Sequence, residues 1–245
     1  MKDFFKNFLD QSSYQQLSSP PQQQGLPQPS LELPWPSNAA LIALPAPAEL
    51  DIPPADLRAM VDQRRSLRHY DRVASISLTE LSYLLWMTQG VKRVTARPAT
   101  LRTVPSAGAR HAFETILLVN RVEGLEPGLY RFIATRHALL RMEASANITV
   151  EMTTACGAQE HILHSAVTFI WMAVTERMSW RYVERSMRYL FLDAGHVCQN
   201  LYLAGEAIGC GVCALAAYDD AQVNALIGAD GLDHFAIYLA TLGKK

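Results

Sequence analysis

The sequence predicts one α+β domain in which a central sheet carries helices on both faces. Two observations support this class. Apolar, β-branched or aromatic segments that read as strands recur at 113–122, 128–133, 137–142, 165–174 and 234–243. Between them stand segments with helical period and clear start and stop signals. The segment 165–174 is nearly all apolar, which predicts a strand buried on both faces of the sheet.

The composition supports a packed core and excludes several partner classes. Hydrophobic residues make up 49% of the chain and charged residues 18%, so most of it has the composition of a folded protein. The 22 Lys and Arg nearly balance the 23 Asp and Glu, which leaves no general basic field for nucleic acid or an anionic membrane. No apolar run is long enough to span a bilayer, and residues 1–11 lack the unbroken apolar core of a signal peptide. We therefore expect a cytoplasmic protein.

Residues 1–48 differ in composition from the rest and predict a Gln/Pro-rich, largely irregular N-terminal arm. The stretch 11–48 has no period and too little apolar surface to offset its ordering entropy. Its prolines favour extended backbone. We expect the arm to reach the folded domain over residues 42–54, and the domain itself to occupy 49–245.

Helical signals begin after the arm. Residues 54–66 predict a short helix that runs into a basic cluster. Ser77 and Glu80 have the spacing of a capping box, and the helix that they open is expected to end at Gly90. After the predicted hairpin of 128–133 and 137–142, a helix is expected over 147–164.

A long helix is expected over about 180–208, and Asp219 is expected to cap a last short helix. Gly195 and Gly205 would destabilise an exposed helix by about 1 kcal/mol each. They are better explained by close approach of another helix, including one from a second subunit.

Four cysteines are present: Cys156, Cys198, Cys210 and Cys213. The C-x-x-C of Cys210 and Cys213 is compatible with redox chemistry, or with half of a zinc site completed by His161 and His164. The apolar surroundings of this pair favour a packing role instead, so we expect no metal.

The first candidate site is the run of Arg64, Arg65, Ser66 and Arg68. Three guanidiniums and a hydroxyl within five positions suit a phosphate or a polar heterocycle, because arginine presents a rigid fork of donors. A solvated basic helix end is the alternative that the local sequence leaves open.

Other candidate stretches are rich in small residues. Residues 105–111 (PSAGARH) would let a flat ligand approach the backbone closely, or would simply form a tight loop. Residues 192–201 and 209–211 (GCG) form a third stretch, and Leu215, Ala216 and Ala217 precede a helix and offer backbone amides. No P-loop, Rossmann fingerprint or nucleophile elbow is present.

Taken in order, these stretches resemble the nitroreductase superfamily, and more closely its SagB-type dehydrogenase branch. The similar segments are RRSLRHY, PSAGARHAFETILLVNRVEGLEPGLYRF, WRYVERSMRYLFLDAGHVCQNLYLAGEAIGCG and YDD. The branch includes azoline dehydrogenases, which oxidise thiazolines and oxazolines in peptide natural products. The resemblance covers about residues 49–243.

The resemblance implies a nitroreductase-like fold with a mostly antiparallel sheet, in an FMN-binding homodimer whose active sites lie at the subunit interface. Residues 64–68 fall on the motif that grips the phosphate, ribityl and pyrimidine oxygens of FMN. Pro105, Ser106 and Ala107 fall on the loop that the partner subunit lends to the flavin.

The resemblance assigns further cofactor contacts toward the end of the chain. Ala216 and Ala217, after Leu215, fall where backbone amides face flavin N5 and O4. Gln159 matches a polar residue at the isoalloxazine edge, and Lys244, after the final strand, a base that binds phosphate.

The sequence departs from the azoline dehydrogenases at Arg181 and Tyr182, where those enzymes carry Lys-Tyr with lysine as the presumed base. A guanidinium is a poor general base because it essentially never loses its proton. Arg181 would instead bind an anionic substrate, stabilise developing negative charge, or pair with Glu184 or Glu176. Tyr182 would donate or relay a proton.

We therefore expect an FMN-dependent oxidoreductase that transfers a hydride through flavin N5 to or from a small molecule or modified peptide, with NAD(P)H as a candidate reductant. The alternative is a flavin-binding scaffold or partner subunit of a biosynthetic complex, with little activity alone.

Overall fold

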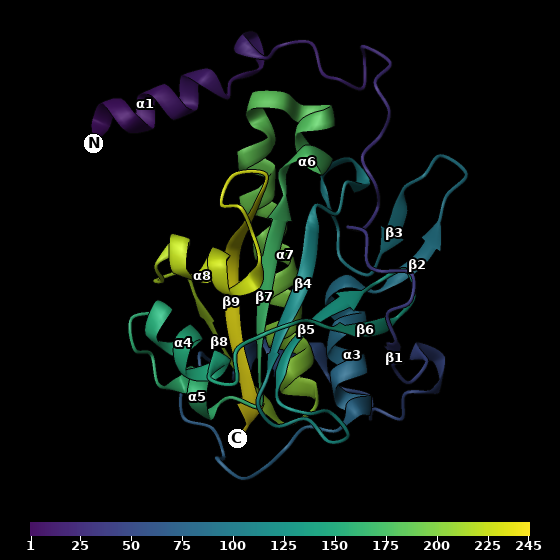
Figure 1. Ribbon diagram of the computed structural model, residues 1–245, viewed down its shortest axis with the longest axis vertical. Coiled ribbons are helices and arrows are strands. Elements are labelled where there is room, and N and C mark those ends of the chain that lie inside the picture. Colours follow the sequence, from purple (N-terminus) through teal and green to yellow (C-terminus); the bar gives the residue numbers. More distant parts are fainter.

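A computed structural model describes residues 1–245 and places a seven-stranded sheet at the centre of the molecule (Figure 1). The strand order is β1-β6-β5-β4-β7-β9-β8, and every neighbouring pair is antiparallel, which confirms the expected sheet type. A separate ribbon pairs β2 with β3. The strands are β1 (Leu41–Ala43), β2 (Val91–Val94), β3 (Thr100–Arg102), β4 (Phe113–Val119), β5 (Gly128–Ile133), β6 (Ala138–Arg141), β7 (Val167–Val174), β8 (Cys210–Leu215) and β9 (His234–Lys244).

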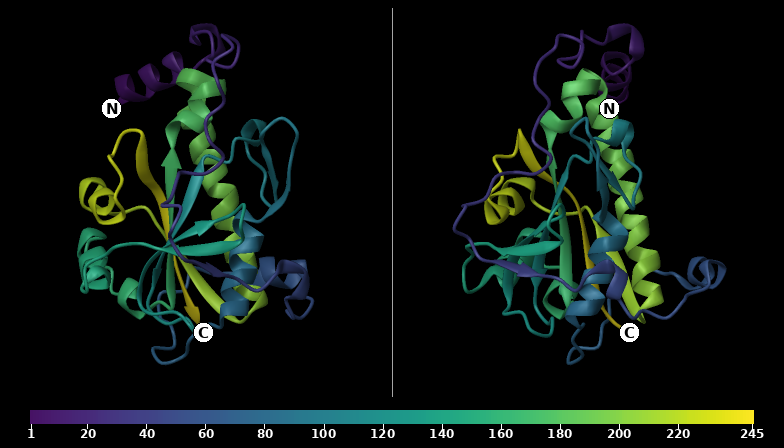
Figure 2. Two further views of the ribbon diagram at one scale, coloured as in Figure 1. Left: turned by 45° about the vertical axis from the view of Figure 1, so that its right-hand side comes forward. Right: turned by 90° about the vertical axis from the view of Figure 1, so that its right-hand side faces the viewer.

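Helices cover both faces of the sheet, as expected (Figures 1 and 2). On one face lie α3 (Leu78–Gln89) and α7 (Ser186–Ala207), and on the other α4 (Ile148–Ala155), α5 (His161–His164) and α8 (Asp220–Ile227). The remaining helices are α1 (Lys2–Gln11), α2 (Leu57–Gln63) and α6 (Thr175–Tyr182), with 3₁₀ turns at Tyr14–Gln16, Pro47–Glu49, Ala107–Ala109 and Val183–Arg185. None of the helices combines the length and the apolar character needed to cross a bilayer.

The central strand β7 contributes side chains to two hydrophobic cores, because successive side chains of a strand point to opposite faces. Phe169 and Trp171 belong to a core of 33 buried residues shared with α3 and α7. Ile170 and Met172 belong to a second core of 15 buried residues shared with α4 and α8. This alternation explains why nearly every residue of the strand is apolar.

The helix start signals in the sequence are confirmed. The Ser77 hydroxyl accepts from the Glu80 N–H at 3.1 Å, and the Glu80 carboxylate accepts from the Ser77 N–H at 2.8 Å. The Asp219 carboxylate accepts from the Gln222 N–H at the start of α8. These caps satisfy backbone donors that the helix itself leaves unpaired.

Two expected helices are interrupted. The helix expected over 147–164 is wrong as one element, because Gly157 and Ala158 have φ of +69° and +58° and separate α4 from α5. The helix expected over 180–208 is likewise divided at Val183, whose φ is +40°, so that α6 ends at Tyr182 and α7 starts at Ser186. Left-handed backbone of this kind cannot continue a helix.

The reason proposed for one helical glycine is also corrected. A Cβ on Gly205 would lie 2.8 Å from Val212 Cγ2, so this glycine admits strand β8 rather than another helix. Gly195 faces open space on the exposed side of α7. The strand β8 itself was not predicted.

The N-terminal arm crosses the molecule from the α7 side to the opposite face and ends in the sheet (Figure 2). Most of it is irregular, but residues 41–43 form β1, which pairs with β6. The expected division at residue 48 therefore stays a prediction, with the sheet already beginning inside the expected arm.

A buried carboxylate holds the middle of the arm. Glu114 of β4 is 2% exposed and accepts from Arg177 Nη2 at 2.5 Å, while Arg131 Nε lies at 4.0 Å. The same carboxylate accepts from the backbone N–H of Leu33 at 2.8 Å, and Arg177 Nε donates to the Ser30 carbonyl at 2.9 Å. Charged groups thus fix the middle of the arm to the sheet, in addition to the apolar packing of Leu33, Ile42 and Leu44 on the two cores.

Replacing this carboxylate should destabilise the protein strongly. Glu114→Ala leaves two buried guanidiniums without a carboxylate, and breaking a buried ion pair in this way costs about 3–5 kcal/mol. Urea unfolding measures the loss. The control Asp62→Ala removes the exposed pair with Arg58 and should change stability by less than about 1 kcal/mol. Equal, small effects of the two variants would contradict the anchoring role.

His111, just before β4, gives the fold a dependence on pH. Its ring is 5% exposed. Burial, and then the charges of Arg102 and Arg110, lower its pKa to about 3. The unfolded chain keeps a histidine pKa of about 6.5. The native state therefore holds a neutral ring where the unfolded chain takes up a proton.

Stability should accordingly fall as the pH drops below about 6.5, by up to about 1.4 kcal/mol per pH unit from this residue. His111→Asn should flatten that slope, since asparagine has no titrating ring and tolerates the φ of +43° found here. The thermal midpoint measured against pH tests this. The exposed control His69→Asn should leave the slope unchanged, and a native slope that persists in His111→Asn would disprove the assignment.

Candidate functional site

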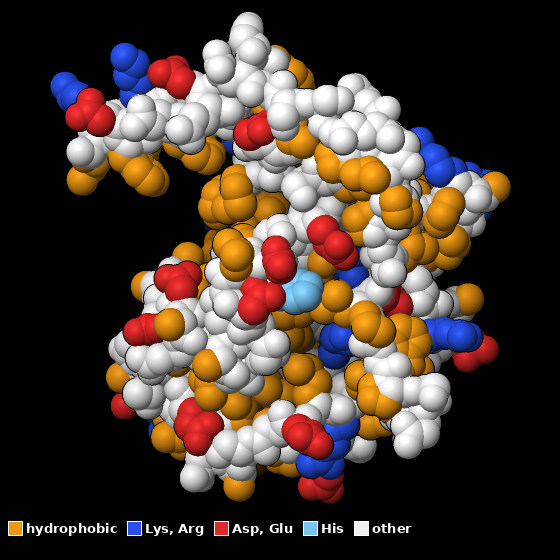
Figure 3. Space-filling view, turned by 45° about the horizontal axis from the view of Figure 1, so that its top comes forward, with side chains coloured by type: hydrophobic (Ala, Val, Ile, Leu, Met, Phe, Trp, Pro, Cys, Tyr) orange, Lys and Arg blue, Asp and Glu red, His pale blue; other side chains and the backbone are white.

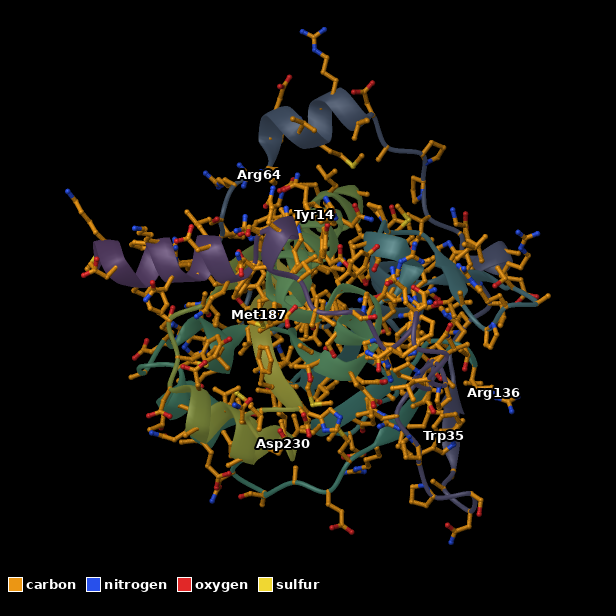
Figure 4. All side chains as sticks on the ribbon, turned by 90° about the horizontal axis from the view of Figure 1, so that it is seen from above. Tyr14, Trp35, Arg64, Arg136, Met187 and Asp230 are labelled. Atoms are coloured by element: carbon orange, nitrogen blue, oxygen red, sulfur yellow. The ribbon has the colours of Figure 1, made fainter.

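The arginine segment, residues 64–68, follows α2 and lies along the edge strand β8. Asp56 caps α2, and the helix ends at Gln63. Ser66 forms a parallel bridge with Val212, and the Leu67 N–H donates to the Val212 carbonyl at 2.9 Å. Figure 4 shows Arg64 at the base of α2, where this projecting helix joins the body.

A pair of glycines lets this segment lie flat on the sheet. Gly211 and Gly243 are partners across β8 and β9. A Cβ on Gly211 would lie 2.2 Å from Leu67 Cδ2, and one on Gly243 would lie 2.7 Å from Tyr70 Cγ. The two glycines thus make room for the side chains that dock the segment.

Tyr202 of α7 connects the segment to β8. Its hydroxyl lies 3.0 Å from Ser66 Oγ and accepts from the Ala214 N–H at 2.9 Å. The Arg64 guanidinium carbon lies 5.3 Å from the centre of the Tyr202 ring. One helix side chain therefore sets the place of both Arg64 and Ser66.

The charges of the segment are not neutralised within the chain. Neither Arg64, Arg65 nor Arg68 forms an ion pair. Arg65 and Arg68 are exposed and Arg64 is half-buried. Three guanidiniums held together without carboxylates are suited to an anion with several oxygens.

The end of β8 adds backbone donors to this region. Leu215 is buried in the sheet, whereas Ala216 and Ala217 are exposed and their N–H groups have no acceptor in the protein. Gln159 Nε2 donates to the Ala217 carbonyl at 2.9 Å and to the Cys156 carbonyl at 2.8 Å. Gln159 therefore positions the Ala217 loop through its own amide group.

Lys244 is partly engaged elsewhere. It is the last residue of β9, rather than following the strand as expected. Its ammonium donates to the Glu80 carboxylate and to the Ile208 carbonyl, the latter at 3.0 Å. Its strand partner Cys210 lies two residues before the bridge to Ser66, so Lys244 borders the arginine segment.

The cysteine pair lies in β8 and has the environment of packed side chains. Cys210 and Cys213 are an odd number of residues apart on one strand, so their thiols point to opposite faces. Burial raises the pKa of Cys210 to about 12, which disfavours the thiolate needed for redox or metal chemistry. His161 is buried near Arg68, whose charge lowers its pKa after burial itself, and its Nε2 has no hydrogen-bond partner.

The second cluster is built on the loop 105–108. Ser106 Oγ donates to Asp193 Oδ2 at 2.6 Å, and the Ala107 N–H donates to Asp193 Oδ1 at 3.2 Å. Burial raises the pKa of Asp193, although these two donors act in the other direction. Pro105 stays exposed beside them. Asp193, on α7, thus clamps the loop.

Arg181 and Tyr182 lie against the same loop. Gly108 has a φ of +57°, and a Cβ there would lie 2.6 Å from the Tyr182 hydroxyl and 3.1 Å from Arg181 Cδ. The Tyr182 ring packs on Tyr189 with centres 4.4 Å apart. Arg181 forms an ion pair with neither Glu184 nor Glu176, so the structural alternative for it is wrong.

The structure thus gathers the expected site residues into two clusters rather than one. Residues 64–68, Gln159, 215–217 and Lys244 lie around the edge of β8 and β9, whereas residues 105–108, Arg181 and Tyr182 lie together elsewhere. Tyr202 and Asp193 belong to these clusters and are nine residues apart on α7, a rise of about 14 Å along the helix.

Sequence reasoning missed the residues that hold these clusters. Tyr202 gave no local signal. Gly211 stands in the candidate stretch 209–211, but its role in making room for Leu67 was not predicted, and neither was that of Gly243. A glycine inside an apolar strand often marks close approach of backbone or ligand, and this is the signal that could have found both.

Comparison with known proteins shows which family has this sequence and fold. The profile of the Nitroreductase family matches residues 61–244. A protein of Methanocaldococcus jannaschii that carries the name of a nitroreductase, MJ1384, is 30% identical over 195 residues, which cover 80% of this chain and 94% of that protein. The trifolitoxin-processing protein TfxB of Rhizobium leguminosarum bv. trifolii is 29% identical over 133 residues, 53% of this chain and 36% of TfxB.

Solved structures show the same fold. A chain from Anabaena variabilis described as a nitroreductase superposes with a TM-score of 0.65 at 28% identity, over 77% of this chain and 38% of that one. This chain therefore spans well under half the length of that protein and of TfxB. A chain of the Escherichia coli microcin synthetase complex McbBCD, solved with truncated pro-MccB17, superposes with a TM-score of 0.62 at 17% identity, over 99% of this chain and 92% of that one.

The match to the family profile covers most of the chain, including both clusters, and the relative MJ1384, which is matched over 94% of its length, agrees with it. The chain belongs to the Nitroreductase family.

Proposed function

We propose that this member of the family is an FMN-dependent oxidoreductase that moves two electrons, as a hydride, through flavin N5 to or from a small molecule or modified peptide. One observation carries the proposal. Three guanidiniums without ion-pair partners lie beside β8. Directly after this strand, the backbone N–H groups of Ala216 and Ala217 have no acceptor in the protein. FMN has the matching groups, a phosphate and an isoalloxazine ring with acceptor atoms.

The residues present fit this cofactor. In the proposal, Arg64, Arg65, Ser66 and Arg68 hold phosphate, ribityl and pyrimidine oxygens, because arginine forks bind such groups with two donors at once. The free N–H groups of Ala216 and Ala217 face N5 and O4 of the ring. Leu215 and Gln159 fix that loop, and Lys244 shares its charge between Glu80 and the phosphate.

We further propose that the active protein is a homodimer in which each flavin lies between two chains. The two clusters are separated along α7, so a loop 105–107 from a second chain is needed to complete the site around the arginine segment. Apolar side chains are exposed where such a chain would pack: Phe4, Phe5 and Leu9 on α1, Leu57 and Val61 on α2, and Phe191 and Leu192 on α7. Figure 3 shows the apolar side of α1 facing a hollow beside the body.

The protein contributes binding and orientation, and FMN when bound supplies the two-electron chemistry. The arginine segment holds the anionic end of the cofactor. Ser106 and Ala107, clamped by Asp193, form a firm loop against the ring face. The Tyr182 hydroxyl, in contact with Gly108, is available to donate a proton to the reacting molecule. NAD(P)H is the proposed reductant.

The pair Arg181 and Tyr182 argues against efficient azoline oxidation. Arg181 stays protonated and cannot act as the base that a lysine would be. A positioned general base contributes a factor of about 10²–10⁴ in rate, so its loss would leave that reaction slow. Vigorous oxidation of a thiazoline peptide by the native protein would contradict this assignment.

A second candidate function is favoured by the likeness to TfxB, which is named for toxin processing. In that case the chain is a flavin-binding partner subunit in a peptide-modifying complex, with the arm as a docking segment and little activity alone. Turnover of NAD(P)H with a nitroarene by the isolated protein favours the first function. A yellow protein that is inert until a partner subunit is added favours the second. The cytoplasmic location expected from the sequence stays a prediction.

Reversing one charge should weaken the cofactor site. Arg65 is exposed and unpaired within the chain, so Arg65→Glu should leave the fold intact. It should weaken FMN binding by at least about tenfold, since a hydrogen bond between charged groups contributes about 1.5–3 kcal/mol. Equilibrium dialysis of the apoprotein against FMN measures the dissociation constant. The control Arg136→Glu changes an exposed arginine at the periphery (Figure 4) and should bind FMN normally. Unchanged FMN affinity in Arg65→Glu would overturn the assignment.

A further inference from the structure

The N-terminal arm and helix α6 line an open cavity of about 450 Å³. The arm lies outside the part of the chain that the family profile matches. Its residues 14–23 form one wall, and Arg181 and Tyr182 form the other. The volume falls within the range of about 300–1,000 Å³ that small-molecule sites occupy.

The arm wall is fixed by specific hydrogen bonds. The Gln22 N–H donates to the Trp180 carbonyl at 2.9 Å, and Trp180 Nε1 donates to the Leu26 carbonyl at 3.0 Å. Ser18 donates through its backbone N–H and its hydroxyl to the Glu184 carboxylate, at 3.0 and 2.7 Å. The cavity is therefore built into the fold and does not depend on a loose tail.

The cavity is cationic. Arg181 forms no ion pair, and no aspartate or glutamate lines the cavity. The nearest carboxylate in the sequence, Glu184, does not line the cavity. It accepts hydrogen bonds from Ser18, and these lower its pKa and so favour its ionised form. The remaining polar groups of the wall are neutral hydroxyls and amides of the arm and the Tyr182 hydroxyl.

A second guanidinium lies behind the first. Arg110 is 7% exposed, its guanidinium carbon is 5.0 Å from the centre of the Trp180 ring, and it donates only to neutral oxygens of Gly108 and Gln28. Burial, and then the charges of Arg181 and Arg97, lower the pKa of Arg110. Two guanidiniums without ion-pair partners therefore lie at this end of α6, and the adjoining carboxylate, Glu184, is held by Ser18 of the arm.

We propose that this cavity binds a carboxylate group of the substrate, with Arg181 as its anchor and arm residues 14–23 as its outer wall. The guanidinium fork of arginine matches a carboxylate with two parallel hydrogen bonds. The inference rests on the proposed function, because Arg181 and Tyr182 touch Gly108, next to the loop proposed to contact the partner's flavin. Arg181 then determines which substrates bind, and Tyr182 is left to donate a proton.

A matched pair of probes tests the proposal. 4-Nitrobenzoate and 4-nitrobenzamide have nearly the same shape and differ in charge. Calorimetry with the oxidised flavoprotein measures binding, and NAD(P)H-dependent reduction measures kcat/KM. The native protein should prefer the carboxylate by at least about tenfold in both measurements, as expected for one charge-assisted pair.

Variants locate the preference. Arg181→Gln should bring the dissociation constants and the kcat/KM values of the two probes within about threefold of each other, since only the carboxylate loses charged hydrogen bonds. Arg181→Lys should keep part of the preference, because it retains the charge without the fork. The surface control Arg136→Gln should behave like the native protein. Tripeptides containing nitrophenylalanine, with a free or an amidated C-terminus, distinguish a peptide carboxylate from that of a small acid.

The outcomes separate this inference from the proposed function. If both probes are reduced but neither pair shows a carboxylate preference, or if Arg181→Gln keeps the native preference, the inference is wrong and the oxidoreductase stands. If Arg181→Gln changed only the apparent affinity for NADPH and left the preference between the two probes unchanged, the inference would also be wrong. If the protein holds no flavin and reduces nothing, the proposed function fails, and calorimetry still shows whether Arg181 binds the carboxylate.

Discussion

Helix α7 is the element on which both parts of the site depend. Asp193, in its first half, clamps the loop of Ser106 and Ala107, and Tyr202, nearer its end, contacts Ser66 and accepts from the Ala214 N–H in strand β8. A helix is rigid on this scale, so the two clusters keep a fixed separation of about 14 Å along its axis. In the proposed dimer, each flavin therefore receives one cluster from each of the two chains.

Two different kinds of interaction attach the arginine segment and the N-terminal arm to the sheet and its helices. The arginine segment docks through shape, because Gly211 and Gly243 leave space for Leu67 and Tyr70 on the sheet. Along residues 18–33 the arm docks through polar groups, from the hydrogen bonds of Ser18 with Glu184 to the buried Glu114 carboxylate at Leu33, and its end packs into the core through Leu44. The space left by the two glycines positions the arginine segment, and the polar contacts of the arm place residues 14–23 beside Arg181.

The sequence correctly predicted the helices and the strand whose formation depends on neighbouring residues. The capping box at Ser77 and the cap at Asp219 begin helices where expected, and the alternating apolar residues of 165–174 form the central strand. The helix breaks at Gly157 and Val183 were missed because apolar residues on both sides keep a helical period through them. Strand β8 was not predicted because its sequence, CGVCAL, consists mostly of small residues and has little of the β-branched and aromatic character that marks a strand.

The candidate site was predictable as a set of motifs but not as an arrangement. The composition of residues 64–68 predicted either an anion-binding segment or a solvated helix end, and the fold shows that no carboxylate pairs with its arginines. Likewise, the sequence does not predict that Arg181 lies beside arm residues more than 150 positions away. It also does not predict that Arg181 forms no salt bridge with Glu184. Such contacts depend on where the fold brings distant segments together.

The central claim is that flavin lies between two chains, each lending one cluster. Sedimentation velocity of the native protein, recorded at the protein band and at the visible flavin band, tests it most directly. The account predicts that both signals move together as a species of two chains with one FMN per chain. Flavin absorbance that sediments with a single chain would contradict it.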